Sequence, residues 1–245
     1  MIMAIQIKSL GSGSGGNCYR LSDGFTQILL ECGLTVKKIR KGLDFQLSGI
    51  AACLVSHGHG DHSKSVKDLI KLGIPCYMSP GCSTSLWLDG DSRCHWVYPR
   101  QIFTVGTLTV YPFETVHDSE THMTGDTLGY YIKSQATGEF ILFVTDTAYI
   151  KPKFKRLDYI MCECNYSEDA IEQSLKSGGI CQAQYKRIVS THFGLNNVVE
   201  FLKANDLSHL KEIYLLHLSN GNSDEALILK TIRQFTGVPV VCCAE

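Results

Sequence analysis

Three histidines and an aspartate lie within six residues of this chain, in the segment Ser56–His62 (SHGHGDH). The segment follows an apolar run, residues 50–55, and precedes residues 64–72, whose apolar positions fall nearly on one helical face. Such a run indicates a strand buried on both faces, followed here by an amphipathic helix. Imidazole and carboxylate are ligands of first-row metal ions, and the two glycines let the loop fold tightly. A solvated turn or a histidine-rich linker would not stand between two packed elements, so the chain is expected to fold around a metal-binding loop.

The ligands of this loop, His57, His59, Asp61 and His62, cannot all bind one ion without strain, so the spacing predicts two metal sites completed by distant residues. Those residues are expected to be His or Asp directly after strands, where loops present side chains from a rigid frame. Three positions fit this expectation: His117, Asp146 and His217, which follow apolar segments at 108–113, 140–145 and 213–216. His122 is the alternative to His117.

Composition limits the class of partner. The 245 residues include 23 Lys and Arg against 24 Asp and Glu, a net charge of −1, so a long polyanion groove built by bulk charge is not expected. A local basic patch in residues 35–43 could still contact nucleic acid.

The beginning of the chain does not resemble a signal peptide, and the longest apolar run is too short to span a bilayer. The eleven cysteines form no Cys-x-x-Cys pair, and this pattern is typical of reduced thiols, so we expect a cytoplasmic protein. The shortness of the apolar runs predicts that it does not enter a membrane.

Local patterns predict alternating strands and helices without a linker, and therefore one domain over residues 1–245. Strands are expected at 5–10, 18–21, 26–31, 50–56, 74–78, 96–98, 108–113, 128–133, 139–145, 158–162, 188–190, 212–216 and 238–242. Helices are expected at 35–43, 64–72, 168–175, 198–204 and 223–235.

Residues 11–16 satisfy the spacing Gly-x-Gly-x-x-Gly, but the chain continues into a hairpin at Asp23-Gly24 rather than a helix, so a dinucleotide-binding fold is not expected. Two interpretations remain for this segment. It can form a nest of amides that holds a substrate phosphate, with Ser14 and Asn17 as contacts, or it can be a simple tight turn.

The order of these motifs resembles the metallo-β-lactamase-fold superfamily of hydrolases. The resemblance covers His-x-His-x-Asp-His at 57–62, Val116-His117-Asp118, an Asp after a strand at 143–147, and a late histidine at 215–219. It implies a mixed α/β fold, a four-layer αββα sandwich with the site at one edge of its two sheets. It also implies the metal ligands: His57, His59 and His117 for one ion, Asp61, His62 and His217 for the other, and Asp146 as the bridge.

A finer resemblance is to the YycJ-type branch of bacterial and phage proteins, which includes DNA exonucleases and phage (anti-Pycsar) phosphodiesterases that destroy cyclic-nucleotide alarm signals. It rests on four motifs: Ser14-Gly15-Gly16-Asn17, Glu163-Cys164-Asn165, Thr191-His192 and His217-Leu218-Ser219. Members of the branch often form homodimers, which the resemblance therefore implies. The chain departs from the family at Glu31, where the family usually has Asp, so no role is transferred to Glu31. Glu163 and Asn165 can reach the site or pair within a turn, and Asn165 is taken as a candidate substrate contact.

These residues predict the chemistry of the site. Two divalent ions about 3.5–4 Å apart can polarise a phosphoryl oxygen and stabilise a leaving alkoxide. Five histidines and two aspartates suit two Zn²⁺ ions per chain, and Mn²⁺ or Fe also fit. Asp61 is expected to orient the attacking water, and His192 to contact phosphate or protonate the leaving group.

The predicted function is a binuclear-metal phosphodiesterase acting on nucleotide phosphodiester bonds, with cyclic nucleotides ahead of DNA ends because the net charge is near zero. The partner is then a small nucleotide. The alternatives are a 5′–3′ DNA exonuclease, a non-catalytic binding protein stabilised by metal, and a mononuclear iron oxygenase. The oxygenase would leave some of Asp61, His62 and His217 without a metal, and structural zinc sites are usually rich in cysteine.

Overall fold

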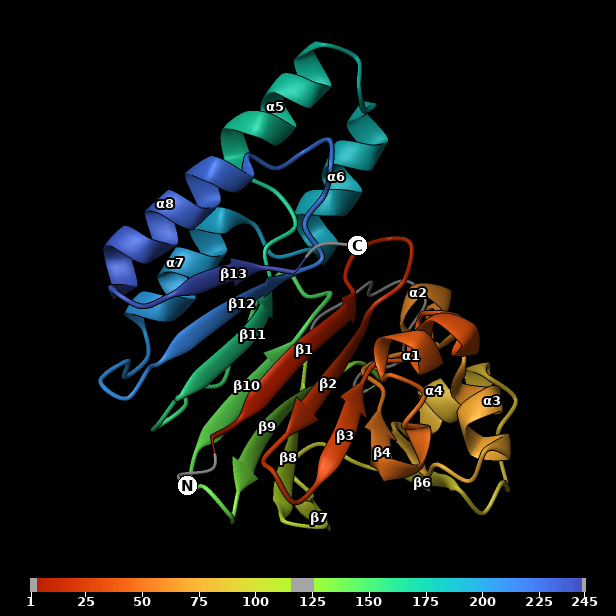
Figure 1. Cartoon of the computed structure of the whole chain (residues 1–245). Helices are drawn as coiled ribbons and strands as arrows, with labels where there is room; N and C mark the ends of the chain where they lie inside the picture. Colours follow the sequence, from red (N-terminus) through yellow and green to blue (C-terminus); the bar gives the residue numbers. More distant parts are fainter. Residues whose placement is uncertain (1–3, 116–125, 244–245) are drawn as a thin grey trace.

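The computed structural model describes residues 4–115 and 126–243, whose strands form two sheets (Figure 1). The first sheet has the order β1 (Gln6–Gly11), β2 (Cys18–Ser22), β3 (Gln27–Leu30), β4 (Ile50–Leu54), β5 (Cys76–Met78) and β6 (Cys94–Trp96). The second has the order β13 (Val240–Cys242), β12 (Glu212–Leu216), β11 (Tyr159–Glu163), β10 (Phe140–Val144), β9 (Leu128–Ser134), β8 (Leu108–Glu114) and β7 (Phe103–Val105).

Helices cover the outer faces of both sheets (Figure 1). Beside the first sheet are α1 (Val36–Gly42), the short 3₁₀ turn η1 (Leu47–Gly49), α2 (Gly60–Ser63), α3 (Val66–Lys71) and α4 (Pro80–Ser85). Beside the second sheet are α7 (Leu195–Lys203) and α8 (Glu225–Thr236), while α5 (Glu168–Lys176) and α6 (Gln182–Thr191) extend beyond its upper edge.

Three clusters of buried side chains separate these layers. Tyr19 and Phe143 meet between the two sheets, with ring centroids 5.9 Å apart. Val198 packs between the second sheet and its helices, and Ile39 does so on the first sheet. Two kinds of strand supply these faces. Apolar side chains alternate in β8 and β9, whereas β10 is apolar throughout and β11 is apolar up to its last residue, Glu163. Antiparallel outer strands commonly bury one face, and central parallel strands bury both. The four-layer αββα sandwich predicted from the resemblance is confirmed.

Parallel strands bring the predicted ligands to one edge. Strands β3, β4 and β5 run parallel in the first sheet, and β10, β11 and β12 do so in the second. The carboxyl ends of parallel strands lie at the same edge, so residues that follow them converge. Glu31, Asp146 and His217 follow β3, β10 and β12, and each has a left-handed backbone, with φ of 64°, 45° and 53°. This conformation is uncommon for residues other than glycine and is concentrated at functional sites.

One predicted element is wrong. Residues 188–190 were expected to form a strand, but they lie inside α6. The helix begins with a capping box in which Cys181 and Gln184 bond each other's backbone, and the residues that follow, rich in Gln, Ala, Lys and Arg, favour a helix over the short β-branched run at its end. By contrast, the helix predicted at 35–43 forms as α1, and Thr35 caps it by accepting a hydrogen bond from the amide of Lys38.

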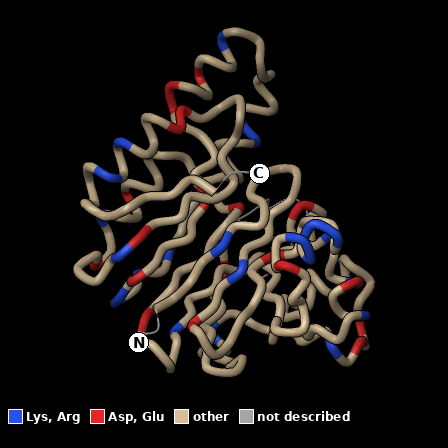
Figure 2. The backbone as a smooth tube through the Cα atoms, in the orientation of Figure 1, with Lys and Arg blue, Asp and Glu red and all other residues tan. Residues whose placement is uncertain are grey.

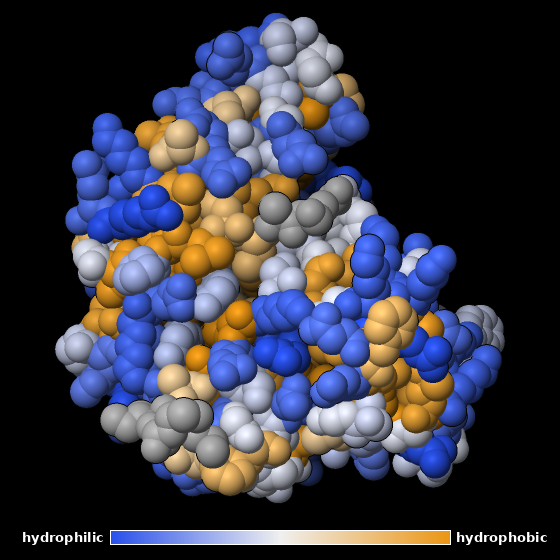
Figure 3. Space-filling view, in the orientation of Figure 1, coloured by the Kyte–Doolittle hydropathy of each residue, from blue (hydrophilic) through white to orange (hydrophobic). Residues whose placement is uncertain are grey.

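Charges of both signs are spread over the face drawn in Figure 2, with a group of basic residues over α1 (Lys37, Lys38, Arg40 and Lys41). Hydrophilic residues cover α5 and α8 on the same face, and hydrophobic residues show along β12 and β13 (Figure 3). Within residues 4–115 and 126–243, no helix is long and apolar enough to cross a membrane.

Candidate metal centre

The loop that carries His57, His59, Asp61 and His62 is held in place by backbone contacts. Gly33, just after β3, lies so close to it that a Cβ atom there would fall 1.6 Å from the carbonyl oxygen of Asp61. That carbonyl accepts a hydrogen bond of 2.7 Å from the amide of Asn17, and the His62 carbonyl accepts one of 2.8 Å from the amide of Cys32. The start of β2 and the turn after β3 therefore fix the loop, and a glycine at position 33 is a steric requirement.

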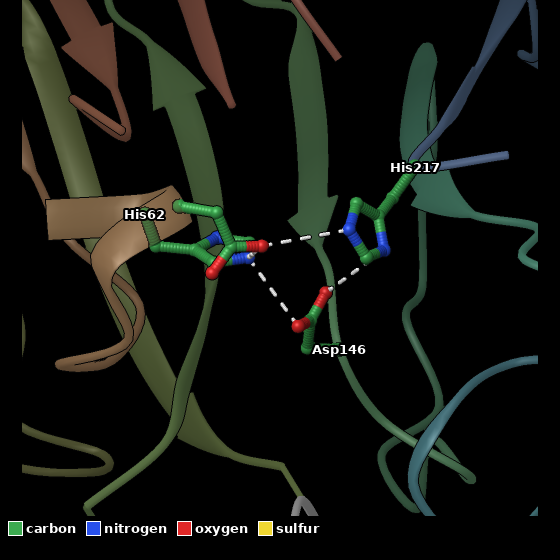
Figure 4. A group of neighbouring side chains, drawn as sticks. His62, Asp146 and His217 are labelled. Atoms are coloured by element: carbon green, nitrogen blue, oxygen red, sulfur yellow. Dashed lines mark ion pairs between the residues drawn. The ribbon is translucent and has the colours of Figure 1, made fainter. Parts of the chain in front are cut away.

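Four predicted ligands meet at the edge of the sandwich: Asp61, His62, Asp146 and His217, with one potential ligand atom each, all within 4.8 Å of one another. Oδ2 of Asp146 lies 3.3 Å from Nε2 of His62, and Oδ1 lies 3.5 Å from Nδ1 of His217. Oδ2 of Asp61 lies 3.3 Å from the same atom of His62. Figure 4 shows the Asp146 carboxylate between the two imidazoles.

A second group shares the same aspartate. His57, His59 and Asp146 also place ligand atoms within 4.8 Å of one another, and Nε2 of His57 lies 3.8 Å from Oδ2 of Asp146. Ser56 Oγ lies 2.9 Å from Nδ1 of His57 and so fixes the orientation of that ring. The two groups therefore have Asp146 in common, the position expected of a bridge. His117, the remaining predicted ligand, and its alternative His122 lie outside the described residues.

Glu163, the last residue of β11, connects His217 to His192. Its Oε1 lies 2.6 Å from Nδ1 of His192 and 3.0 Å from Nδ1 of His217. Its Oε2 accepts hydrogen bonds from the amides of Thr147 and Phe193, at 3.3 and 3.2 Å. The carboxylate is fully buried, whereas the side chain of His192 remains 14% exposed. His192 therefore lies at the partly exposed edge of the site, where the buried carboxylate of Glu163 holds its ring in place.

Two opposing effects set the pKa values in the cluster: burial favours the neutral form of each group, and a neighbouring opposite charge favours its charged form. Burial alone would raise the pKa of Asp146, but His62 and His217 lower it well below its usual range. Burial alone would lower the pKa of His217, but Asp146 and Asp61 raise it to about 10. Burial likewise opposes protonation of His192, but Glu163 raises its pKa. The carboxylates and imidazoles of the cluster therefore favour each other's charged forms.

The cluster fits divalent cations. Nε2 of His217 is buried and has no hydrogen-bond partner among residues 4–115 and 126–243, although it lies 3.6 Å from Oδ2 of Asp61. A buried ring nitrogen without a partner is costly, and a metal ion between it and the carboxylate would satisfy it. The donor set of imidazoles and carboxylates suits borderline metals such as Zn²⁺. Because a metal ion binds the deprotonated imidazole, metal binding would compete with protons for these groups.

Glu31 lies behind this site rather than in it. It is fully buried, and its two oxygens accept a hydrogen bond from the amide of Ser56, at 3.1 and 3.3 Å. Oε2 also lies 3.7 Å from Nδ1 of His62. Burial raises the pKa of Glu31 to about 7, despite the opposing charge of His62. The longer Glu side chain thus reaches both the metal-binding loop and one of its histidines.

The three predicted substrate contacts have different environments. Ser14 is exposed in the turn after β1. Asn17 is fully buried: its side chain bonds the amide of Gly13 and lies 3.2 Å from Nε2 of His62, so it supports the loop and one ligand. Asn165 donates to the carbonyl of His217 at 3.1 Å and lies 3.3 Å from its Nδ1. Ser14 and Asn165 both line one cavity beside His217.

The sequence alone leaves two places for Glu163, the metal site or a turn, and the structure places it beside His192 and His217. The signal that could have located it is the apolar strand at 158–162, since Glu163 ends that strand as Asp146 and His217 follow theirs. The left-handed conformations at Glu31, Asp146 and His217 could not be located from the sequence, because Asp and His adopt this conformation more often than most residues but usually remain in the common regions, and Glu rarely adopts it.

The fold and this site together define a metal-dependent hydrolase. The chain belongs to the β-lactamase superfamily: a family model described as "Beta-lactamase superfamily domain" matches residues 26–218. Exodeoxyribonuclease WalJ of Streptococcus pneumoniae is 26% identical over 239 residues, 91% of this chain and 85% of that protein. Exodeoxyribonuclease YycJ of Bacillus anthracis is 23% identical over 95% of this chain and 89% of its own length. Among solved structures, the metallo-β-lactamase fold protein YhfI of Bacillus subtilis is similar with a TM-score of 0.74 at 16% identity, over 98% of this chain and 96% of that one.

Proposed function

We propose that this protein is a phosphodiesterase that hydrolyses nucleotide phosphodiester bonds with two metal ions. The observation that carries the proposal is the pair of ligand groups that share Asp146: Asp61, His62 and His217 on one side, and His57 and His59 on the other. Two ions joined by one carboxylate suit the displacement of an alkoxide from phosphorus, because charge develops on both the attacking and the leaving oxygen.

The ligands assigned here are the predicted ones. His57, His59 and His117 would hold one ion, and Asp61, His62 and His217 the other, with Asp146 between them. Zn²⁺ fits this donor set, and Mn²⁺ or Fe can replace it. When bound, the ions would lower the pKa of a water molecule and withdraw charge from a phosphoryl oxygen. Asp61, whose side chain is 27% exposed, is placed to accept a hydrogen bond from the attacking water.

His192 is assigned as the general acid. Its Nδ1 is bonded to Glu163, which fixes the ring and favours its protonated form, so Nε2 is the atom that would deliver the proton to the leaving oxygen. The buried carboxylate of Glu163 would thus orient the His192 imidazole and stabilise its protonated form, as the carboxylate of a hydrolytic triad does for its histidine.

Two nucleotide substrates are candidates, the end of a DNA strand and a small cyclic nucleotide, and a different observation supports each. The names of the curated relatives, both exodeoxyribonucleases, favour the end of a DNA strand. The net charge of −1 favours a small cyclic nucleotide, because binding a long duplex relies on a surplus of basic residues. Both substrates place one phosphodiester at the metal ions, so the assigned residues serve either.

The test is hydrolysis by purified protein loaded with Zn²⁺ or Mn²⁺, assayed on cyclic mononucleotides and on 5′-phosphorylated DNA. Release of mononucleotides from DNA, with cyclic nucleotides left intact, would establish the exonuclease. The opposite result would establish the cyclic-nucleotide phosphodiesterase. If neither substrate nor bis(p-nitrophenyl) phosphate is cleaved by the protein with two ions bound, the proposal fails.

A cytoplasmic location and a homodimeric state are also proposed. The described part of the chain includes all eleven cysteines, and each is a free thiol, which fits a reducing cytoplasm. A homodimer is proposed from the resemblance to the YycJ-type branch. Light scattering tests it directly, since a dimer has twice the mass of the 27.2 kDa chain.

A further inference from the structure

A cavity of about 390 Å³ adjoins the metal centre. Most of its lining comes from the turn after β1, the segment after β12 and the end of β13, which lie together at the upper edge of the sandwich (Figure 1). Asn165 after β11 and Glu225 at the start of α8 complete it. His217 and Asn165 belong both to its lining and to the metal centre. Whatever occupies the cavity is therefore in contact with the residues beside the reacting phosphate.

The walls of the cavity are held by hydrogen bonds from several elements. The amide of His217 donates to Ser12 Oγ at 2.9 Å, which ties the segment after β12 to the turn after β1. The amide of Ser219 donates to the carbonyl of Asn165 at 2.9 Å, and Ser223 Oγ donates to the carbonyl of Ser219 at 2.6 Å. The cavity is thus formed by loops that are fixed to one another, as in a preformed binding site.

The lining disfavours a second phosphate in this cavity. Among the lining residues that the structure describes, none is Lys or Arg, and Glu225 contributes a carboxylate. A phosphate dianion next to this carboxylate would be repelled. Hydroxyl, amide and carboxylate groups from Ser14, Asn220 and Glu225 instead match a neutral ligand that carries several hydroxyl or N–H donors.

We infer that this cavity binds the single nucleoside attached to the phosphate at the metal centre, with a sugar hydroxyl or a base N–H group bonded to Glu225. This inference rests on the proposed phosphodiesterase function and deepens it. The cavity volume lies near the lower end of the range of small-molecule sites, which suits one nucleoside rather than a dinucleotide. The enzyme thereby recognises a terminal or isolated nucleotide one unit at a time.

The experiment compares the binding of inorganic phosphate with that of deoxynucleoside and nucleoside 5′-monophosphates, by calorimetry on the metal-loaded protein. The monophosphates are expected to bind at least about tenfold more tightly than phosphate, the contribution of one charge-assisted hydrogen bond together with burial of the base. Glu225→Gln is expected to remove about tenfold of this preference while the affinity for phosphate stays unchanged.

Two controls separate the inference from the function. Glu172→Gln, on the exposed face of α5, removes a carboxylate outside the cavity and is expected to leave nucleotide binding unchanged. Hydrolysis of bis(p-nitrophenyl) phosphate, which has no nucleoside, reports the metal centre alone and is expected to be the same in Glu172→Gln as in the wild-type protein.

If the protein cleaves bis(p-nitrophenyl) phosphate but binds monophosphates no better than phosphate, the inference is overturned and the phosphodiesterase stands. If monophosphates are preferred, and the preference depends on Glu225, but no phosphodiester is cleaved, the nucleoside cavity stands and the proposed hydrolysis fails. A thermal unfolding midpoint equal to that of the wild-type protein verifies that Glu225→Gln is folded.

Discussion

Nδ1 of His192 lies 2.6 Å from Oε1 of Glu163, although the two residues are 29 positions apart and come from different elements. A buried carboxylate that bonds one ring nitrogen fixes the orientation of the imidazole and stabilises its protonated form. The same carboxylate also bonds His217, so the proposed acid and a proposed metal ligand share one support.

Replacing His192 with alanine is expected to reduce kcat by about 10²–10⁴-fold, the usual contribution of a general acid, because the leaving oxygen would depart without a proton. The content of metal is expected to stay at the wild-type value, since His192 is assigned no ion. Steady-state kinetics and elemental analysis of the same sample measure the two quantities. Turnover equal to wild type would reduce His192 to a packing residue.

Glu163→Gln tests the role of the Glu163 carboxylate in positioning His192, whereas His192→Ala tests the proposed general acid itself. Loss of the carboxylate is expected to lower the pKa of His192, because Glu163 raises it in the native protein. A general acid acts in its protonated form, so activity falls as the pH rises through its pKa. The basic limb of the pH–kcat profile should therefore move to lower pH in Glu163→Gln, measured at saturating metal. An unmoved limb with unchanged kcat would contradict this role, and Glu172→Gln is the control for a lost surface carboxylate.

Asp146→Asn is expected to lose both metal ions and all turnover, since the two ligand groups have only this residue in common. An amide is a weaker ligand than a carboxylate and carries no charge to balance two cations. Elemental analysis after dialysis measures the stoichiometry, and Asp169→Asn on the exposed surface of α5 is the matched control. Two ions retained per chain in Asp146→Asn would refute a bridging role.

The order of strands and ligands could be predicted because each ligand follows an apolar segment. Asp146 and His217 were located in this way, and parallel strands carry both to the same edge as the loop after β4. Local sequence could not reveal the contact between Gly33 and the carbonyl of Asp61, because it joins segments 28 residues apart and depends on tertiary packing. The strand predicted at 188–190 failed for a related reason: three β-branched or small residues at the end of α6 adopt the conformation of the helix they complete.

Gly33→Ala is therefore expected to destabilise the fold and the metal centre together. The new methyl group would lie 1.6 Å from the Asp61 carbonyl oxygen, so the metal-binding loop must move away from β3. Overpacking of this kind usually costs about 1–3 kcal/mol in the free energy of unfolding. Urea unfolding and metal titration measure the two effects. Gly49→Ala is the control, since its nearest neighbour would be 3.7 Å away, and equal stability of the two variants would contradict the steric argument.

Asp23 joins the two sheets at the end of the sandwich that bears the β2–β3 turn. Its carboxylate accepts hydrogen bonds from Thr107 Oγ1 at 2.6 Å and Ser134 Oγ at 2.8 Å, and from the amide of Thr26 at 2.8 Å. Burial alone would raise its pKa, but these hydrogen bonds lower it below the usual value. Asn cannot accept as many bonds, so Asp23→Asn is expected to cost about 1–3 kcal/mol at neutral pH.

The pH dependence of this cost has a definite sign. A carboxylate whose pKa is lower in the folded than in the unfolded state stabilises the fold above the unfolded pKa of about 3.9 and loses that contribution as the pH falls through the folded value. The difference in stability between wild type and Asp23→Asn should thus be constant from pH 7 to about pH 5 and shrink below about pH 4. Urea unfolding at a series of pH values measures it, with Asp44→Asn, an exposed carboxylate, as the control. A difference that grows on acidification would show that the hydrogen bonds to Asp23 do not favour its charged form.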